Sequence, residues 1–183
     1  SLLALITLFG CKPTAQHPIA TQSKMKSIAP AAGQSVVSGH VWFAGAVPAP
    51  RTYRVVSDKA CCASGEEWHT SEEVIVNGEG ALKNVFVYVS KGLEDAAFPS
   101  PQTPVVLDQK GCRFVPHVLG IQAGQPLRIL NSDNTLHNVH ALAQQNKAFN
   151  LGMTIKNPEA QRVFIAPEIM IPIRCNVHPW MEA

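Results

Sequence analysis

Short apolar runs separated by turn residues make up the chain from Val36 onward. The runs are rich in β-branched and aromatic residues, and Asn77-Gly78, Lys110-Gly111 and Ala123-Gly124 lie between them as turn signals. Strands are predicted over residues 36–43, 53–56, 73–77, 84–89, 104–107, 113–118, 127–131, 137–142, 162–165 and 170–175, with a turn of helix over residues 91–97. Many short strands at this spacing predict an all-β fold, an antiparallel β-sandwich with Greek-key connections.

The N-terminal residues follow a different pattern. Residues 2–9 form an apolar run less than half as long as the roughly 20 residues that a membrane-spanning helix needs, and the small Gly10 follows them. This pattern predicts the end of a signal peptide. Residues 8–11 (Leu-Phe-Gly-Cys) also resemble a bacterial lipobox, in which Cys11 carries a lipid anchor; the alternative is an ordinary signal peptide with a chance cysteine. Both interpretations predict export to the periplasm or the cell surface.

Composition limits the organisation and the partners of the chain. Its 183 residues suit one domain, and 46% hydrophobic with 15% charged residues is typical of a folded protein. We predict a signal-peptide remnant over residues 1–10, a flexible tether rich in Pro, Ala, Gln, Ser and Lys over residues 11–35, and the β-sandwich over residues 36–183. The net charge is only +2 and no basic cluster occurs, so the sequence gives no support for an electrostatic nucleic-acid surface, and we expect no nucleic-acid partner.

The most informative motif lies at the end of the last predicted strand. Residues 175–181 (Cys-Asn-Val-His-Pro-Trp-Met) place a thiolate, an imidazole and a thioether in one loop. A thiolate with two imidazoles and a distant thioether is the ligand set of electron-transfer copper sites. The second imidazole is expected from residues 137–142. Because side chains alternate across a strand, His137 and His140 face opposite sides, and only one of them can reach the site.

These residues resemble the cupredoxins, the type 1 blue-copper family of β-sandwiches. Residues 136–140 (Leu-His-Asn-Val-His) are similar to the family's Pro-His-Asn-Val strand, and the terminal loop is similar to the Cys-x-x-His-Pro-x-Met loop of its amicyanin members. The resemblance implies one copper ion held by His137, Cys175, His178 and Met181. It implies that Asn138 ties the two ligand-bearing segments together and donates toward the cysteine sulfur. It also implies a further strand beyond residue 183, as in exported plastocyanin-like proteins, and weaker copper binding without that strand.

Other residues near the motif have simpler interpretations. We expect His140 to be a half-exposed strand residue and Met153 a packing residue, since methionine commonly fills gaps in cores. Zinc is the main alternative metal, because one cysteine and two histidines can hold it. Methionine is a poor zinc ligand, however, and Met181 would be idle in such a site, so copper is favoured.

The remaining cysteines admit two interpretations. In an exported protein, a disulfide between Cys112 and either Cys61 or Cys62 is the expected arrangement, and it leaves one thiol. The alternative is a second metal site that combines one of the adjacent pair with Cys112, His69 or His117, although no metal-ligand spacing organises these residues.

A copper ion whose coordination is filled by the protein leaves no open position for a substrate, so we predict electron transfer without enzymatic activity. The expected partner is a redox protein such as a c-type cytochrome or a dehydrogenase, with no small-molecule substrate. It would dock at an exposed edge of His178 framed by Pro179 and Trp180. One alternative is a copper-handling or structural cell-surface module. Another is the electron-entry domain of a copper oxidoreductase, which is disfavoured because Arg174 and Asn176, not histidines, flank the cysteine.

Overall fold

The structure is a computed structural model that describes residues 26–28, 36–55, 58–62, 67–92 and 99–183. The chain divides into two units, Ser1–Gly39 and His40–Ala183. In the first unit, β1 (Lys26–Ile28) pairs antiparallel with β2 (Val36–Ser38). β1 lies in a segment that we expected to be a flexible tether; it gains backbone hydrogen bonds from β2, whose valines favour strands. The predicted signal peptide and the lipidation site at Cys11 lie outside the described residues.

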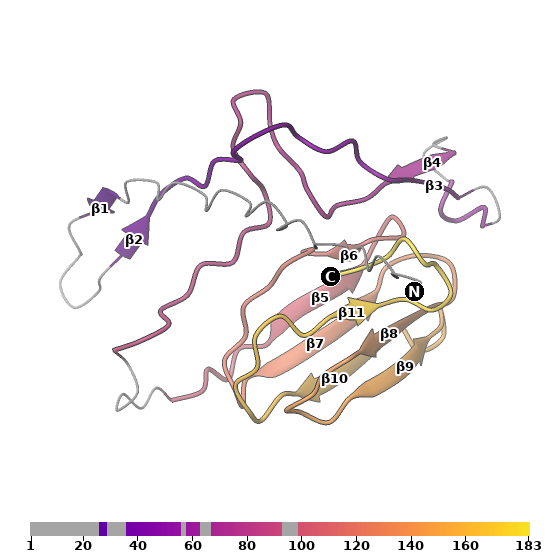
Figure 1. The fold of residues 1–183 in the computed structure, drawn as a ribbon. Helices are drawn as coiled ribbons and strands as arrows, with labels where there is room; N and C mark the ends of the chain where they lie inside the picture. Colours follow the sequence, from indigo (N-terminus) through magenta and orange to yellow (C-terminus); the bar gives the residue numbers. More distant parts are fainter. Residues whose placement is uncertain (1–25, 29–35, 56–57, 63–66, 93–98) are drawn as a thin grey trace, which may run out of the picture. The chain divides into compact units, whose positions relative to one another are not determined.

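The second unit is built from two β-sheets and a separate strand pair (Figure 1). One sheet has the strand order β10-β7-β5-β6, and the other has the order β11-β8-β9. The strand pair consists of β3 and β4. Their bounds are β3 (Thr52–Arg54), β4 (Trp68–Thr70), β5 (Val105–Gln109), β6 (Phe114–Val115), β7 (Pro126–Asn131), β8 (His137–Ala141), β9 (Phe149–Met153), β10 (Glu159–Val163) and β11 (Ile173–Arg174).

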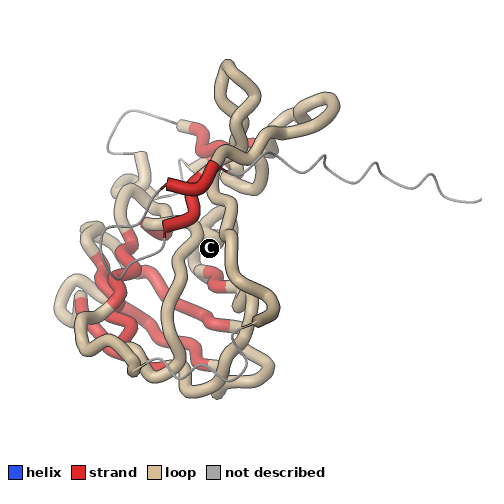
Figure 2. The backbone as a smooth tube through the Cα atoms, turned by 90° about the vertical axis from the view of Figure 1, so that its left-hand side faces the viewer, coloured by secondary structure: helices blue, strands red, loops and turns tan. Residues whose placement is uncertain are grey.

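The two sheets share one core. Leu107 of β5, Ile129 of β7 and Val139 of β8 are fully buried members of the same apolar cluster. Gln109 Nε2 on β5 donates to Met153 Sδ on β9 over 3.0 Å, which joins the two sheets directly. Figure 2 shows strands and loops but no helix in the described part of the chain, so nothing there could cross a bilayer as an apolar helix. The prediction of an all-β fold is confirmed.

Several local predictions differ from the structure. β5 and β7 run parallel, whereas we expected only antiparallel pairs. Residues 84–89 form no strand, and the side chains of residues 85–89 are 41–65% exposed because none of the strands in the described residues pairs with them. Residues 73–77 contribute only an isolated bridge from Val76 to Leu82. Most of the expected helical turn lies outside the described residues.

Strands β4 and β9 were missed by the sequence pattern. β9 contains Asn150 and Gly152, which are poor strand formers, so its sequence lacks a strand signal. It is held instead by a five-residue antiparallel register with β8, in which Met153 lies opposite His137. Tertiary pairing therefore outweighs local propensity at this strand.

Candidate metal centre

The loop that follows β11 folds its three candidate ligands inward. Met181 N donates to His178 O over 3.0 Å, and Cys175 N donates to Met181 O over 3.1 Å, so the backbone makes a tight turn. Ile173 and Ala183 exchange both of their backbone hydrogen bonds, which closes the loop as a hairpin. The side chains of Cys175, His178 and Met181 are only 3%, 3% and 1% exposed. The loop thus buries a thiol, an imidazole and a thioether together.

The fourth candidate ligand comes from the neighbouring strand. β11 lies beside β8 and pairs with it (Figure 1). His137 begins β8, and its side chain is completely buried. The ligand atoms of His137, Cys175 and His178 all lie within 4.8 Å of one another. His137 Nδ1 lies 2.9 Å from His178 Nδ1, and Cys175 Sγ lies 3.8 Å from His178 Nδ1. Cys175 and His178 are therefore close to His137 in space, although His178 is 41 positions away from it in the chain.

Asn138 ties the two ligand-bearing segments together. Its Oδ1 accepts a 2.6 Å hydrogen bond from Asn176 N and lies 3.4 Å from Cys175 Sγ. Its Nδ2 donates to Asn150 Oδ1 on β9 over 2.6 Å, which fixes the orientation of the amide. The side-chain oxygen can accept from Cys175 only in its thiol form, whereas the backbone N–H of Asn138 donates toward the sulfur and stabilises the thiolate. This network couples β8 to the terminal loop.

A carboxylate that the sequence analysis did not identify holds the outer edge of His137. Asp133 Oδ2 lies 3.0 Å from His137 Nε2. The backbone N–H groups of Gly111 and Cys112 donate to the same carboxylate over 2.7 and 2.8 Å. Burial raises the pKa of Asp133, but the hydrogen bonds from His137 and from the two backbone groups outweigh it and hold the pKa below its usual value. Asp133 is therefore an ionised acceptor.

A second carboxylate holds His178 in the same way. Asp58 Oδ2 lies 3.0 Å from His178 Nε2, although the two residues are 120 positions apart in the chain. Thr135 Oγ1 donates to Asp58 over 2.7 Å, and Ala60 N donates over 2.9 Å. These bonds outweigh burial and lower the pKa of Asp58. The position of Asp133, just before the predicted ligand strand, is a signal that could have identified it from the sequence. No comparable signal marks Asp58.

The two carboxylates decide which nitrogens face the site. An ionised carboxylate can only accept, so each ring must carry a proton on Nε2. In the neutral form of both rings, the Nδ1 lone pairs of His137 and His178 then face each other across 2.9 Å. Two lone pairs at this distance require a cation between them, which can be a proton or a metal ion.

Electrostatics favour a thiolate beside this pair. Burial raises the pKa of Cys175, but hydrogen bonds from His137 and His178 outweigh it and lower the pKa to about 5. Burial lowers the pKa of His137, but Asp133 and Cys175 outweigh it and raise the pKa to about 9. The donor set is a thiolate, two imidazoles and a buried thioether, which fits a soft or borderline metal ion.

The expected exposed edge of His178 is not observed. The ring is 3% exposed because Asp58 lies against its Nε2 and the Trp180 ring packs with its centroid 5.1 Å away. Pro179 is exposed, whereas Trp180 is half-buried and donates from Nε1 to Cys112 O over 3.1 Å. A partner at this surface would therefore contact Pro179 and Trp180, with the imidazole behind them.

Among the remaining cysteines, Cys61 and Cys112 form a disulfide, and Cys62 is a free thiol that donates to Val55 O over 3.0 Å. The sulfurs of the disulfide lie within 4.8 Å of a ring nitrogen of His178, but they are bonded to each other. The alternative of a second metal site on Cys61 and Cys112 is therefore wrong for the structure, because neither sulfur is a free thiolate.

The other residues weighed in the sequence analysis lie outside the cluster. His140 Nδ1 lies 3.2 Å from Asn176 Oδ1, and alternation along β8 gives His140 the opposite face to His137. Met153 is buried, with its sulfur against Gln109. His69 packs edge-on against the Trp180 ring at 6.0 Å, and His117 lies 3.9 Å from Glu72. None of these side chains belongs to the group formed by His137, Cys175 and His178.

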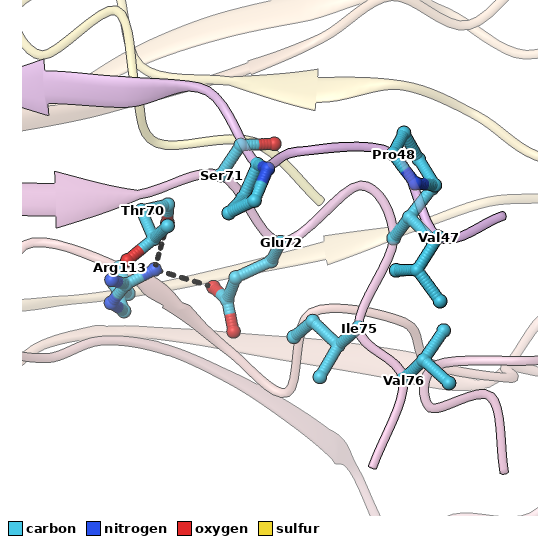
Figure 3. A pocket seen from close by; sticks show the side chains of 10 residues that line it. Val47, Pro48, Thr70, Ser71, Glu72, Ile75, Val76 and Arg113 are labelled. Atoms are coloured by element: carbon cyan, nitrogen blue, oxygen red, sulfur yellow. Dashed lines mark hydrogen bonds and ion pairs between the residues drawn. The ribbon is translucent and has the colours of Figure 1, made fainter. Parts of the chain in front are cut away.

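A cavity of about 380 Å³ lies elsewhere in the second unit, between residues 47–50 and residues 70–76 (Figure 3). Its main charged groups, Glu72 and Arg113, form an ion pair of 3.2 Å. Arg113 also donates to Thr70 O over 3.0 Å. Because acid and base neutralise each other there, the buried Cys/His cluster is the better candidate for a functional site.

No protein-family description and no curated protein matches the chain. Among solved structures, a Cu-containing nitrite reductase (NirK) from Thermus scotoductus SA-01 is 21% identical over 48% of this chain, with a TM-score of 0.41. The chain covers only 23% of that reductase. A proline-to-glycine mutant of amicyanin, in its reduced Cu(I) form at pH 4, is 20% identical over 62% of this chain and 90% of its own, with a TM-score of 0.39. An oxidized amicyanin with another such mutation is 19% identical over 61% and 89%, with a TM-score of 0.38.

Proposed function

We propose that the protein is a cupredoxin that binds one type 1 copper ion through His137, Cys175, His178 and Met181 and transfers electrons. The observation that carries this proposal is the buried convergence of a thiol and two imidazoles, whose ligand atoms all lie within 4.8 Å of one another. Bound copper would supply one-electron redox chemistry, because thiolate and thioether suit its reduced form and imidazole suits both forms. The buried Met181 favours copper over zinc.

The residues around the ligands suit a carrier because they resist rearrangement. The ring of His137 is held by Asp133, that of His178 by Asp58, and Asn138 links β8 to the terminal loop. Ligands held this firmly change little when an electron arrives or leaves, which favours fast transfer. A protein-filled coordination shell also leaves no open position for a substrate, so the proposal is a carrier without enzymatic activity.

Location and partner are part of the same proposal. The Cys61–Cys112 disulfide supports an oxidising compartment, in agreement with export to the periplasm or cell surface and with a lipid anchor on Cys11. A redox protein such as a c-type cytochrome or a dehydrogenase would dock where Pro179 is exposed and Trp180 half-buried.

A second candidate is a copper-handling or structural module without electron transfer. It is favoured by one observation, the burial of the His178 edge, since a carrier that docks directly on its imidazole ligand needs that edge exposed.

A copper(II) titration of the protein, followed by visible absorption and electron paramagnetic resonance, separates the two candidates. An intense thiolate-to-copper charge-transfer band with narrow hyperfine splitting supports the carrier. Cys175→Ser should abolish the band, and His140→Ala is the matched control that should retain it, because His140 lies away from the cluster. A colourless complex, or a preference for zinc, would refute the type 1 site.

A further inference from the structure

Both imidazoles of the cluster are held at their outer nitrogen by a carboxylate. Asp133 lies 3.0 Å from Nε2 of His137, and Asp58 lies 3.0 Å from Nε2 of His178. The two rings are 0% and 3% exposed, so water does not compete strongly for these nitrogens. A carboxylate on the far nitrogen of a metal-binding histidine fixes its tautomer and orientation and increases its basicity as a ligand.

Asp58 is itself held in place before any metal binds. A turn surrounds it, in which Asp58 N donates to Val55 O over 3.2 Å and Cys61 N donates to Asp58 O over 3.1 Å. Its side chain accepts from Ala60 N and from Thr135 Oγ1 as well as from the imidazole. With its acceptor positions occupied on both oxygens, the carboxylate cannot turn away from His178 without losing these bonds.

The disulfide links the two segments that hold the carboxylates of Asp58 and Asp133 in place. Cys112 N donates to Asp133 over 2.8 Å, while Cys61 lies in the turn of Asp58. The Cys61–Cys112 bond therefore ties the segment that carries Asp58 to the loop that anchors Asp133. This link explains how a residue 120 positions from His178 can serve it.

We infer that Asp58 and Asp133 are positioning residues of the metal centre: they hold both imidazoles with Nδ1 toward the metal and strengthen them as donors to a divalent ion. The inference rests on the proposed metal site and deepens it. Neither carboxylate touches the point where the ligand atoms converge, so each acts through its histidine. A stronger donor favours the more highly charged metal, so the pair shifts the balance of a copper couple toward the cupric form.

The test compares two substitutions of Asp58 with a matched loss of charge elsewhere. Asp58→Asn keeps an acceptor for the imidazole but removes the charge, whereas Asp58→Ala removes both. Glu159→Gln is the control, because Glu159 is an exposed partner of Arg128 on β10. In the full protein, Zn(II) and Cu(II) affinities are measured by competition, the reduction potential by voltammetry, and the protonated ring nitrogen of His178 by nitrogen-15 NMR of the metal-free form.

We expect His178 to carry its proton on Nε2 in the wild type, in Asp58→Asn and in Glu159→Gln. In Asp58→Ala, a fraction of the molecules should carry it on Nδ1 instead. Affinity for the divalent ions should fall about 10–100-fold in Asp58→Ala and be largely rescued in Asp58→Asn. The cupric preference of Asp58→Asn should fall about tenfold, which raises a one-electron potential by about 59 mV.

Two results would overturn the inference. One is a wild-type His178 with its proton on Nδ1; the other is an Asp58→Ala variant whose divalent-metal affinity and ring tautomer match those of Glu159→Gln. Failure of the proposed function looks different. A colourless copper complex in the wild type would reject the type 1 site. The positioning role would still be supported if the Zn(II) affinity and the tautomer of His178 depend on Asp58.

Discussion

The disulfide between Cys61 and Cys112 should account for a large share of the stability of the second unit. It joins residues 51 positions apart. The loop-entropy relation assigns about 3 kcal/mol to a loop of about 15 residues and about 4.7 kcal/mol to one of about 100, so this bridge should contribute about 4 kcal/mol. Both half-cystines are buried, at 4% and 0% exposure. Alanine at these positions should therefore form few new contacts that offset the loss of the bridge.

The comparison must also prevent the neighbouring thiol from forming a new bridge. We therefore compare Cys61→Ala/Cys62→Ala/Cys112→Ala with Cys62→Ala alone, which keeps the disulfide and loses only the hydrogen bond of the thiol to Val55 O. The single variant should cost about 1 kcal/mol or less relative to wild type. The triple variant should cost about 4 kcal/mol more than the single one.

The assay is urea unfolding without reductant, followed by tryptophan fluorescence and extrapolated to water. A difference below about 1 kcal/mol between the triple and the single variant would refute the entropic reasoning. Addition of a reducing agent gives an independent check, because it should destabilise Cys62→Ala and leave the triple variant unchanged.

Three further outcomes concern the rest of the fold. Asn146→Ala should lower the free energy of unfolding by about 2–3 kcal/mol, since Asn146 is 9% exposed and bonds Ile165 N, Ala166 N and Ala166 O; the exposed neighbour Gln145→Ala should stay near wild type. Phe114→Ala should cost about 3–5 kcal/mol by opening a cavity in the core, against about 0.5 kcal/mol for the half-exposed Val115→Ala, both measured by urea unfolding. The N–H of Gln144 and those of neighbouring residues lower the pKa of Glu168 below its usual 4.5, so its stabilisation is present above about pH 4.5 and is lost as pH falls through the folded-state pKa. Glu168→Gln should therefore be less stable than wild type at about pH 7, and the gap should narrow as the pH falls below about 4.5; a gap that does not narrow in acid would contradict this origin.

Local spacing was sufficient for the ligand candidates. Cys175, His178 and Met181 occupy one loop, and strand alternation separated His137 from His140. The structure brings His137, Cys175 and His178 together, buries Met181, and leaves His140 outside that group. The all-β class also followed from short-range pattern. Those features depend on residues within a few positions of each other, where backbone geometry limits the outcomes to a small number.

The strand predictions were wrong where pairing with another strand, not local composition, decided the structure. Residues 84–89 have a strong strand composition but no neighbour in the described part of the chain to pair with, whereas β9 has a weak composition and a complete partner in β8. A strand therefore formed where a partner strand offered backbone hydrogen bonds, and a single sequence does not state which segments lie side by side.

The sequence by itself determined the all-β class and the identity of the four candidate ligands, because both depend on side-chain periodicity and on spacing within a single loop or strand. Only the tertiary structure decided that Cys112 bonds Cys61, that Asp58 and Asp133 hold the imidazoles, and that the His178 edge is covered. The physical reason is distance along the chain: Asp58 meets His178 across 120 positions, and a contact of that range is selected by the packing of the whole unit, which no local pattern encodes.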